Sequence, residues 1–332
     1  MPEPSLWILI IIIIMALGFG IVNGFNDAAN AIATVIGTRT LSPRNAIIMA
    51  AVFNLAGAAT GTAVAKTIGK GILIPEAISY QTVVAALGAV IVWTSLATYW
   101  GLPVSLTHGF VAAMAAAGIA AAGTGAVAWG VLGKVASAVV TAPVIGFIGG
   151  FAFMVLILWI FRKSVPAKVR GFFGNAQMVS SAFMAYSHGK NDGQMPIGII
   201  TMAFVLYTGN EGMWDRIPWW IIVVSALSIS LGTMVGGWRV IKTLGMRVTN
   251  LRPVHGFAAE ASAATVIEVA SHLGIPVSTT HCISSAVMGV GATRRLSAVR
   301  WGVAGNIIAA WIITFPVCGV LGYLLSWLLG LF

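Results

Sequence analysis

Residues 101–108 read Gly-Leu-Pro-Val-Ser-Leu-Thr-His, and residues 274–281 read Gly-Ile-Pro-Val-Ser-Thr-Thr-His. Three other motifs also recur in the same order in the two halves of the chain. GFNDAAN at residues 24–30 is echoed by GKNDGQ at 189–194, WGVLG at 129–133 by WGVAG at 301–305, and TAP at 141–143 by TFP at 314–316. Four motifs in register indicate a duplicated unit. We therefore predict two related halves, residues 1–165 and residues 166–332.

Composition limits the class of protein that these halves form. The 332 residues are 59% hydrophobic and 8% charged, whereas a soluble domain carries roughly 25% charged residues. A soluble core cannot hide so much apolar surface, and two cysteines, Cys282 and Cys318, are too few for a disulfide framework. These observations exclude disordered chains, disulfide scaffolds and ordinary soluble enzymes. They leave an integral membrane protein whose partner is the lipid bilayer.

Apolar segments long enough to span a bilayer fall into two groups. They are residues 6–36, 45–65, 81–122 and 127–161, followed by 176–207, 217–238, 254–291 and 300–331. The net charge of +10 gathers in short loops, which the positive-inside rule places in the cytoplasm without any need for a nucleic-acid partner. The most basic of these loops holds Arg162, Lys163, Lys168 and Arg170. On this assignment the segment with Glu211 and Asp215 and both chain termini face outside.

Two of these segments do not fit the pattern of one straight helix. Residues 6–36 would form a helix about 45 Å long, against a hydrocarbon core of ~30 Å, and they contain Asn23, Asn26, Asp27 and Asn30. Residues 81–122 suffice for two passes, yet residues 100–105 at their middle are uncharged. We therefore expect a broken helix, and a helical hairpin whose tip stays at membrane depth.

The direction of the second half follows from the basic loop between the halves. A first half that starts outside and ends inside crosses the membrane an odd number of times, so the second half must run the opposite way. The predicted fold is all-α: a polytopic membrane protein of two inverted repeats, each with a broken helix and a helical hairpin.

Asp27 and Asp192 occupy equivalent positions within apolar segments. An ionisable residue at the bilayer centre costs ~2.5–3.5 kcal/mol on insertion scales, so a repeated one indicates function. Carboxylate and amide oxygens are hard ligands for Na⁺, and a carboxylate can also carry a proton. We expect a cation site, with Asp27 and Asp192 as metal ligands if the ion is Na⁺. Further oxygen donors in the same motifs are Asn26, Asn30, Asn191 and Gln194. The alternative is helix capping or helix–helix hydrogen bonding by the Asn-Asp pairs.

In each Pro-Val-Ser motif, proline ends one helical segment and hydroxyl residues open the next. Backbone N–H groups, hydroxyls and the positive helix end then point to one place, which suits an oxyanion. One such tip alone would more simply be an N-cap, but two facing tips can enclose an anion. His108 and His281 follow directly and are expected to orient the hydroxyls, to support them from behind or to carry protons. Glu260 is expected to back the site or to pair with Arg252 or His255.

Residues 24–31 (GFNDAANA), residues 187–194 (SHGKNDGQ) and the two PVS-x-TH elements resemble the inorganic phosphate transporter (PiT) family. The resemblance covers nearly the whole chain and implies sodium- or proton-coupled phosphate symport, an inverted-repeat fold and a homodimer. It assigns phosphate to the hydroxyls of Ser105, Thr107, Ser278, Thr279 and Thr280. It assigns the cations to Asn26, Asp27, Asn191 and Asp192. Leu106 departs from the pattern, because a hydroxyl is expected there by analogy with Thr279.

These observations predict a secondary active transporter that imports inorganic phosphate with Na⁺ or H⁺ across the cell membrane. The main alternative is a transporter of sulfate or another oxyanion with the same fold. Phosphate can still donate a proton near neutral pH, so the acceptors at Asp27 and Asp192 favour phosphate. A channel would not need paired cation sites, and an enzyme would not repeat every polar motif. We expect no catalytic residues, and no cofactor besides the coupling ion.

Overall fold

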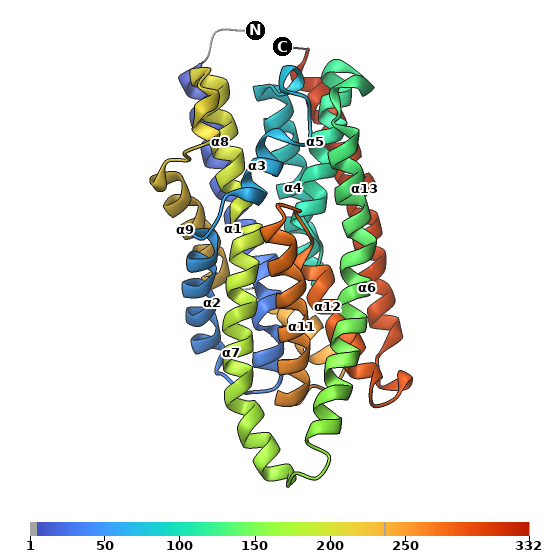
Figure 1. Cartoon of the computed structure of the whole chain (residues 1–332). Coiled ribbons are helices and arrows are strands. Elements are labelled where there is room, and N and C mark those ends of the chain that lie inside the picture. Colours follow the sequence, from blue (N-terminus) through green and yellow to red (C-terminus); the bar gives the residue numbers. More distant parts are fainter. Residues whose placement is uncertain (1–4, 236, 332) are drawn as a thin grey trace.

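The computed structural model describes residues 5–235 and 237–331, except for the side chains of residues 28–30. In this part of the chain every named element is a helix, and the helices form one elongated bundle (Figure 1). The predicted all-α fold class is confirmed.

The helices of the first half are α1 (Leu6–Gly37), α2 (Pro43–Ala58), α3 (Ala63–Lys70), α4 (Tyr80–Trp100), α5 (Leu106–Ala122) and α6 (Trp129–Ile160). Those of the second half are α7 (Pro166–Asp192), α8 (Gln194–Thr208), α9 (Trp219–Val235), α10 (Trp238–Lys242), α11 (Pro253–His272), α12 (Thr279–Ala292) and α13 (Trp301–Leu329). A π-helical turn, Thr243–Arg247, continues α10, and 3₁₀ turns occupy Pro75–Ala77, Thr124–Ala126, Glu211–Trp214 and Leu296–Ala298.

The element order of the second half matches that of the first. α1 corresponds to α7 with α8, the bent pair α2–α3 to α9–α10, the hairpin α4–α5 to α11–α12, and the long helix α6 to α13. The bends are sharp, 74° between α2 and α3 and 63° between α9 and the segment that begins with α10. Among the described residues α1, α4, α6 and α13 are long and apolar enough to cross a membrane, and each bent pair adds a span if it is counted as one broken helix.

The break expected within residues 6–36 is not where it was predicted. α1 continues from Leu6 to Gly37 through Asn26 and Asp27. It contains no proline, and neighbouring helices bury these two side chains, so its backbone has no cause to break. The interruptions lie instead in the pairs α2–α3 and α9–α10, and at Gly193 between α7 and α8.

Both predicted hairpins are present. The first reverses between α4 and α5 and the second between α11 and α12. Each turn begins with a glycine in the left-handed region, Gly101 with φ 74° and Gly274 with φ 68°, which residues with a Cβ atom adopt only with strain. The first hairpin occupies the half of the bundle near the termini and the second occupies the other half (Figure 1). Their tips therefore approach each other near the middle of the molecule.

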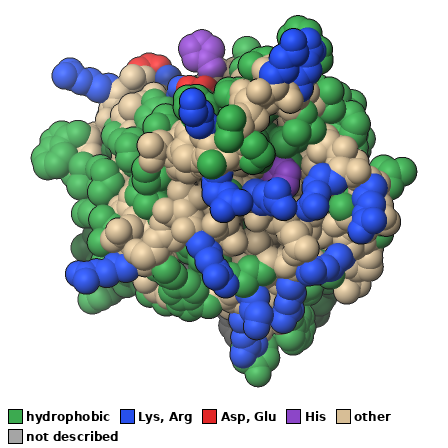
Figure 2. All heavy atoms as spheres, turned by 90° about the horizontal axis from the view of Figure 1, so that it is seen from below, with side chains coloured by type: hydrophobic (Ala, Val, Ile, Leu, Met, Phe, Trp, Pro, Cys, Tyr) green, Lys and Arg blue, Asp and Glu red, His purple; other side chains and the backbone are tan. Residues whose placement is uncertain are grey.

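The two halves run in opposite directions along the bundle. α1 starts at the end of the molecule where α13 finishes, and α6 ends at the opposite end, where α7 begins (Figure 1). Seen from that opposite end, the surface is rich in Lys and Arg (Figure 2). The basic loops between α1 and α2, between α6 and α7, and between α12 and α13 thus share one end.

Glycines let the polar helices cross at close range. A Cβ atom at Gly24 of α1 would lie 2.1 Å from the Ile229 carbonyl oxygen of α9. A Cβ atom at Gly189 of α7 would likewise lie 2.1 Å from the Asn54 carbonyl oxygen of α2. Each glycine opens the Asn-Asp motif of its half, so equivalent tight crossings position the two aspartates.

Candidate functional site

The hairpin tips begin their second arms with equivalent caps. Ser105 Oγ accepts from the His108 backbone N–H over 3.3 Å, and Ser278 Oγ accepts from the His281 backbone N–H over 3.1 Å. The capping interpretation therefore holds for both serines. An N-cap serine uses its oxygen as acceptor and can still donate its hydroxyl hydrogen.

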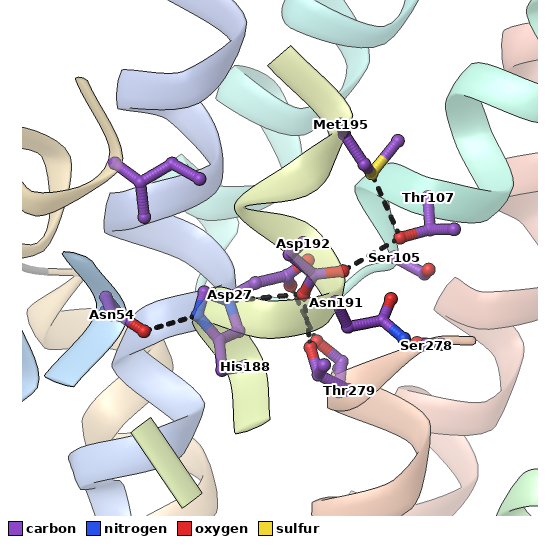
Figure 3. A network of polar contacts seen from close by, with 12 residues as sticks. Asp27, Asn54, Ser105, Thr107, His188, Asn191, Asp192, Met195, Ser278 and Thr279 are labelled. Carbon is purple, nitrogen blue, oxygen red and sulfur yellow. Dashed lines mark hydrogen bonds and ion pairs between the residues drawn. The ribbon is translucent and has the colours of Figure 1, made fainter. Parts of the chain in front are cut away.

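The threonines of the tips bond the buried aspartates (Figure 3). Thr107 Oγ1 donates to Asp192 Oδ1 over 3.0 Å, and Thr280 Oγ1 donates to Asp27 Oδ1 over 2.6 Å. Each of these bonds joins the hairpin of one half to the aspartate of the other half. Thr279 Oγ1 adds a bond of 2.6 Å to Asp192 Oδ2. The structure thus brings the predicted hydroxyls and the predicted carboxylates into one site.

The asparagines that precede the aspartates contact the first arms of the hairpins. The Asn26 side-chain amide lies 2.6 Å from Thr98 Oγ1 on α4. Asn191 Nδ2 donates to Ser271 Oγ on α11 over 2.9 Å. Asn191 Oδ1 is buried and has no hydrogen-bond partner among the described residues. An amide oxygen beside a carboxylate is a ligand that a hard cation can use.

Asp192 has a further neighbour that sequence reasoning missed. His188 Nε2, one helical turn earlier on α7, lies 3.1 Å from Asp192 Oδ2. The opposite ring nitrogen, His188 Nδ1, lies 2.8 Å from Asn54 Oδ1 of α2, which orients the ring (Figure 3). The motif SHGKNDGQ contained this histidine at i−4 from the aspartate, a spacing that faces it along a helix. Nothing in the sequence around Asn54 indicated its role.

The two predicted histidines pack behind the tips. The His108 and His281 ring centroids are 4.8 Å apart. His108 stacks on Phe315 and His281 on Trp311, both on α13, with centroid distances of 5.3 and 4.0 Å. Their ring nitrogens have no hydrogen-bond partner in the described part of the chain. These contacts place both rings as packing supports of the tips.

For two other residues predicted for the site, Gln194 and Glu260, the structure shows no bond to the aspartates or the tip hydroxyls among the described residues. Gln194 Oε1 accepts from the Ala65 backbone N–H over 3.1 Å, so Gln194 caps the start of α3. The Asn30 side chain lies outside the described residues. Of the two expectations for Glu260, pairing with Arg252 or His255 is wrong, because its carboxylate is bonded by residues of α1 and α7.

Glu260 belongs to a separate polar cluster between α1, α7 and α11. It is fully buried, and its carboxylate accepts hydrogen bonds from Thr34, Gln177 and Ser180. Donors from α1 and α7 thus satisfy this carboxylate, so it needs no cationic partner at the start of α11.

The chemistry of the site is that of oxygen donors. No group of three His, Cys, Asp or Glu side chains that could hold a metal occurs among the described residues. The tip motifs, residues 101–108 and 274–281, contain no Lys or Arg. Lys190 stands beside Asn191 but pairs with Glu268. Two buried carboxylates without a fixed positive side chain repel an anion unless a cation or a proton neutralises them.

Comparison with known proteins identifies the family. A model of the phosphate transporter family matches residues 23–322. The chain belongs to this family. A probable low-affinity inorganic phosphate transporter of Bacillus subtilis is 42% identical over 324 residues, which cover 97% of each chain. A protein of the same description from Rhizobium meliloti is 41% identical over 319 residues, covering 96% of this chain and 95% of the relative.

A solved structure has the same fold as this phosphate transporter family member. It is described as a sodium-dependent phosphate transporter and superposes with a TM-score of 0.91 at 29% identity, covering 98% of this chain and 100% of that one. Together with the apolar helices, these matches establish a multi-pass membrane transporter and not an enzyme.

Proposed function

We propose that this transporter imports inorganic phosphate by symport with a cation. The observation that carries the proposal is the set of hydrogen bonds in which Thr107, Thr279 and Thr280 donate to Asp192 and Asp27. The expected phosphate ligands, the threonine hydroxyls, are thus bonded to the expected cation ligands, the aspartates. Binding of a cation to the aspartates would therefore change the ability of the hydroxyls to bind phosphate.

These bonds supply a physical basis for coupling. A hydroxyl has a single hydrogen, so a threonine that donates to an aspartate cannot donate the same hydrogen to phosphate. A cation or proton at Asp27 and Asp192 occupies the acceptor lone pairs and removes the charge that repels an anion. The threonine hydrogens can then turn to phosphate, together with the N-terminal N–H groups of α5 and α12.

The acceptors of the site favour phosphate over sulfate. Phosphate near neutral pH still carries at least one proton and needs an acceptor for it, whereas sulfate needs donors alone. Asp192, with His188 Nε2 at 3.1 Å, offers such a group beside the donors Thr107 and Thr279. We expect excess sulfate to compete poorly with phosphate uptake.

Alternating access follows from a second part of the proposal, that residues 1–165 and 166–332 are inverted repeats. Support comes from the matching element order, the opposite directions of the halves and the equivalent bonds of Thr107 and Thr280. The hairpins enter the bundle from opposite ends, so each tip screens the site from one side. Movement of one tip at a time would open the site to one side of the membrane.

Na⁺ is the coupling ion that we favour over H⁺. Carboxylate, amide and hydroxyl oxygens are its usual ligands, and the relative with the same fold is described as sodium-dependent. Labelled phosphate uptake into proteoliposomes, with Na⁺ and pH gradients imposed separately, distinguishes the two ions. Accumulation driven by the pH gradient alone would contradict Na⁺ coupling.

Substitution of the aspartates tests the cation role directly. In Asp27→Asn and Asp192→Asn we expect uptake to fall about 100-fold or more, because loss of a buried charge–ion contact costs roughly 3 kcal/mol or more. Glu211→Gln is the matched control, since it removes an exposed carboxylate that the whole of α8 separates from Asp192. Uptake that stays at the control level in both aspartate variants would overturn the proposal.

The placement of the protein completes the proposal. We propose that it lies in the cell membrane with the basic end in the cytoplasm and both termini outside, as the positive-inside rule predicts. We also propose a homodimer, on the resemblance to the family, which cross-linking in native membranes would test.

A further inference from the structure

An apolar groove runs between two long helices on the outside of the bundle. It has a volume of about 780 Å³ and separates α6 from α13. α13 lines it with Trp301, Ile308, Ile312 and Phe315, and α6 lines it with Val144 and Ile148. Their spacing puts the α13 residues on one helical face, about 21 Å long at ~1.5 Å per residue. One leaflet of a ~30 Å core is ~15 Å thick, so the groove is long enough to hold an acyl chain of one leaflet along its length.

A polar cavity of about 520 Å³ lies at the basic end of the same helix. Its walls include Arg294, Arg295 and Arg300. Arg300 Nη1 donates to the backbone carbonyls of Met246 and Arg247, both over 3.1 Å, which holds this guanidinium in place. Within the described residues none of the three arginines forms an ion pair with a carboxylate.

The cavity and the groove both include residues at the start of α13. Arg300 lines the polar cavity and the next residue, Trp301, lines the apolar groove. The Trp301 side chain is 47% exposed, and its Nε1 donates to the Leu296 carbonyl over 2.9 Å. A tryptophan with one polar contact at such a boundary is typical of the membrane interface. The combined surface therefore passes from cationic to apolar at the depth where a phospholipid does.

The arginines are not required by the fold. The equivalent loop of the first half, residues 123–128, reads Gly-Thr-Gly-Ala-Val-Ala and precedes α6 as residues 295–300 precede α13. It carries no charge, yet it ends in a similar 3₁₀ turn and a helix that starts with tryptophan. The three positive charges thus belong to one end of the molecule and to one leaflet.

We propose that this surface binds an anionic phospholipid of the leaflet at the basic end. The phosphate group occupies the arginine cavity, where guanidinium groups bond its oxygens in pairs, and an acyl chain fills the groove between α6 and α13. Charge complementarity and continuity with the groove favour a phospholipid over free phosphate, which would leave the apolar part unfilled. Because Met288 and Ser285 of α12 also line the groove, the bound chain contacts the second hairpin.

Quenching of Trp301 tests the proposal without reference to transport. The full-length protein in detergent is titrated with phosphatidylglycerol or phosphatidylcholine that carry the same brominated acyl chains, and the signal of Trp301→Phe is subtracted. We expect saturable quenching, with half-saturation at about tenfold less phosphatidylglycerol than phosphatidylcholine. In the triple variant R294Q/R295Q/R300Q the concentration of phosphatidylglycerol at half-saturation should rise about 100-fold. This estimate assumes that each basic residue near an anionic lipid contributes ~1 kcal/mol.

A matched variant separates a site from general attraction to the basic end. K163Q/K168Q/R170Q removes the same number of charges from the loop between α6 and α7 and should leave the phosphatidylglycerol titration unchanged. Equal effects of the two triple variants, or equal quenching by both lipids, would overturn the proposal. So would displacement of the lipid by millimolar inorganic phosphate, which would assign the arginines to the free anion. Absence of quenching by either lipid would also refute it and would indicate that a second copy of the chain covers the groove.

Discussion

At the scale of single residues, the two aspartates of the site have unequal surroundings. Asp192 accepts from two tip hydroxyls, Thr107 and Thr279, and lies beside His188, whereas Asp27 accepts from one tip hydroxyl, Thr280, and from the Leu106 backbone N–H. Leu106 is the cause of part of this difference, since it occupies the place in the first tip that Thr279 occupies in the second. The halves therefore share a framework but offer two different cation environments.

This inequality predicts different costs for similar substitutions. Thr280→Val should lower the uptake efficiency for phosphate by tens of fold, because it removes a phosphate donor and also a bond to a charged group, worth about 1.5–3 kcal/mol. Thr279→Val also removes a phosphate donor, but it should cost less than Thr280→Val, since Asp192 keeps Thr107 and His188. Initial-rate uptake in proteoliposomes measures both. Thr280→Ser retains the hydroxyl and should remain near wild type; equal losses in the Val and Ser variants would show that volume matters and not the bond.

At the scale of the elements, close helix crossings position the site. Gly24→Ala should destabilise the fold by about 1–3 kcal/mol, because its new methyl group would meet the α9 backbone. The control on the same helix is Gly18→Ala, where no atom outside the helix lies within 4 Å. That variant should be neutral or slightly stabilising, as alanine favours a helix. Thermal unfolding in detergent measures the difference; equal midpoints for the two variants would contradict the tight crossing.

The sequence was informative about elements and much less so about their partners. The hairpins were predictable because each Pro-Val-Ser motif lies in an uncharged turn within a long apolar segment. Such a segment can form two helices whose turn stays at membrane depth, covered by the rest of the protein. The break in α1 was predicted wrongly, because segment length and polar content do not distinguish a broken helix from a long one whose polar groups are bonded by neighbours. The partners of Glu260 and the contact of His188 with Asn54 join residues far apart in the chain. No local pattern encodes such contacts.

At the scale of the whole molecule, opposite directions of the halves make the two ends chemically different. Basic loops gather at one end, and the acidic turn Glu211–Trp214 follows α8 toward the other (Figures 1 and 2). Each hairpin tip thus approaches the site from an end with its own charge. If the basic end faces the cytoplasm, as proposed above, phosphate that leaves the site would pass a surface whose positive potential attracts anions.

Single cysteines test this arrangement in cells. Asn210→Cys lies in the exposed loop after α8 and Ser164→Cys in the exposed loop between α6 and α7. The natural Cys282 and Cys318 are 0% exposed, so they should stay unreactive in the folded protein. A membrane-impermeant maleimide should label Asn210→Cys in intact cells and Ser164→Cys only after permeabilisation. The reverse pattern would invert the proposed orientation. Labelling of both from outside would mean that α7 and α8 together do not cross the membrane an odd number of times, which would contradict the proposed topology of the second half.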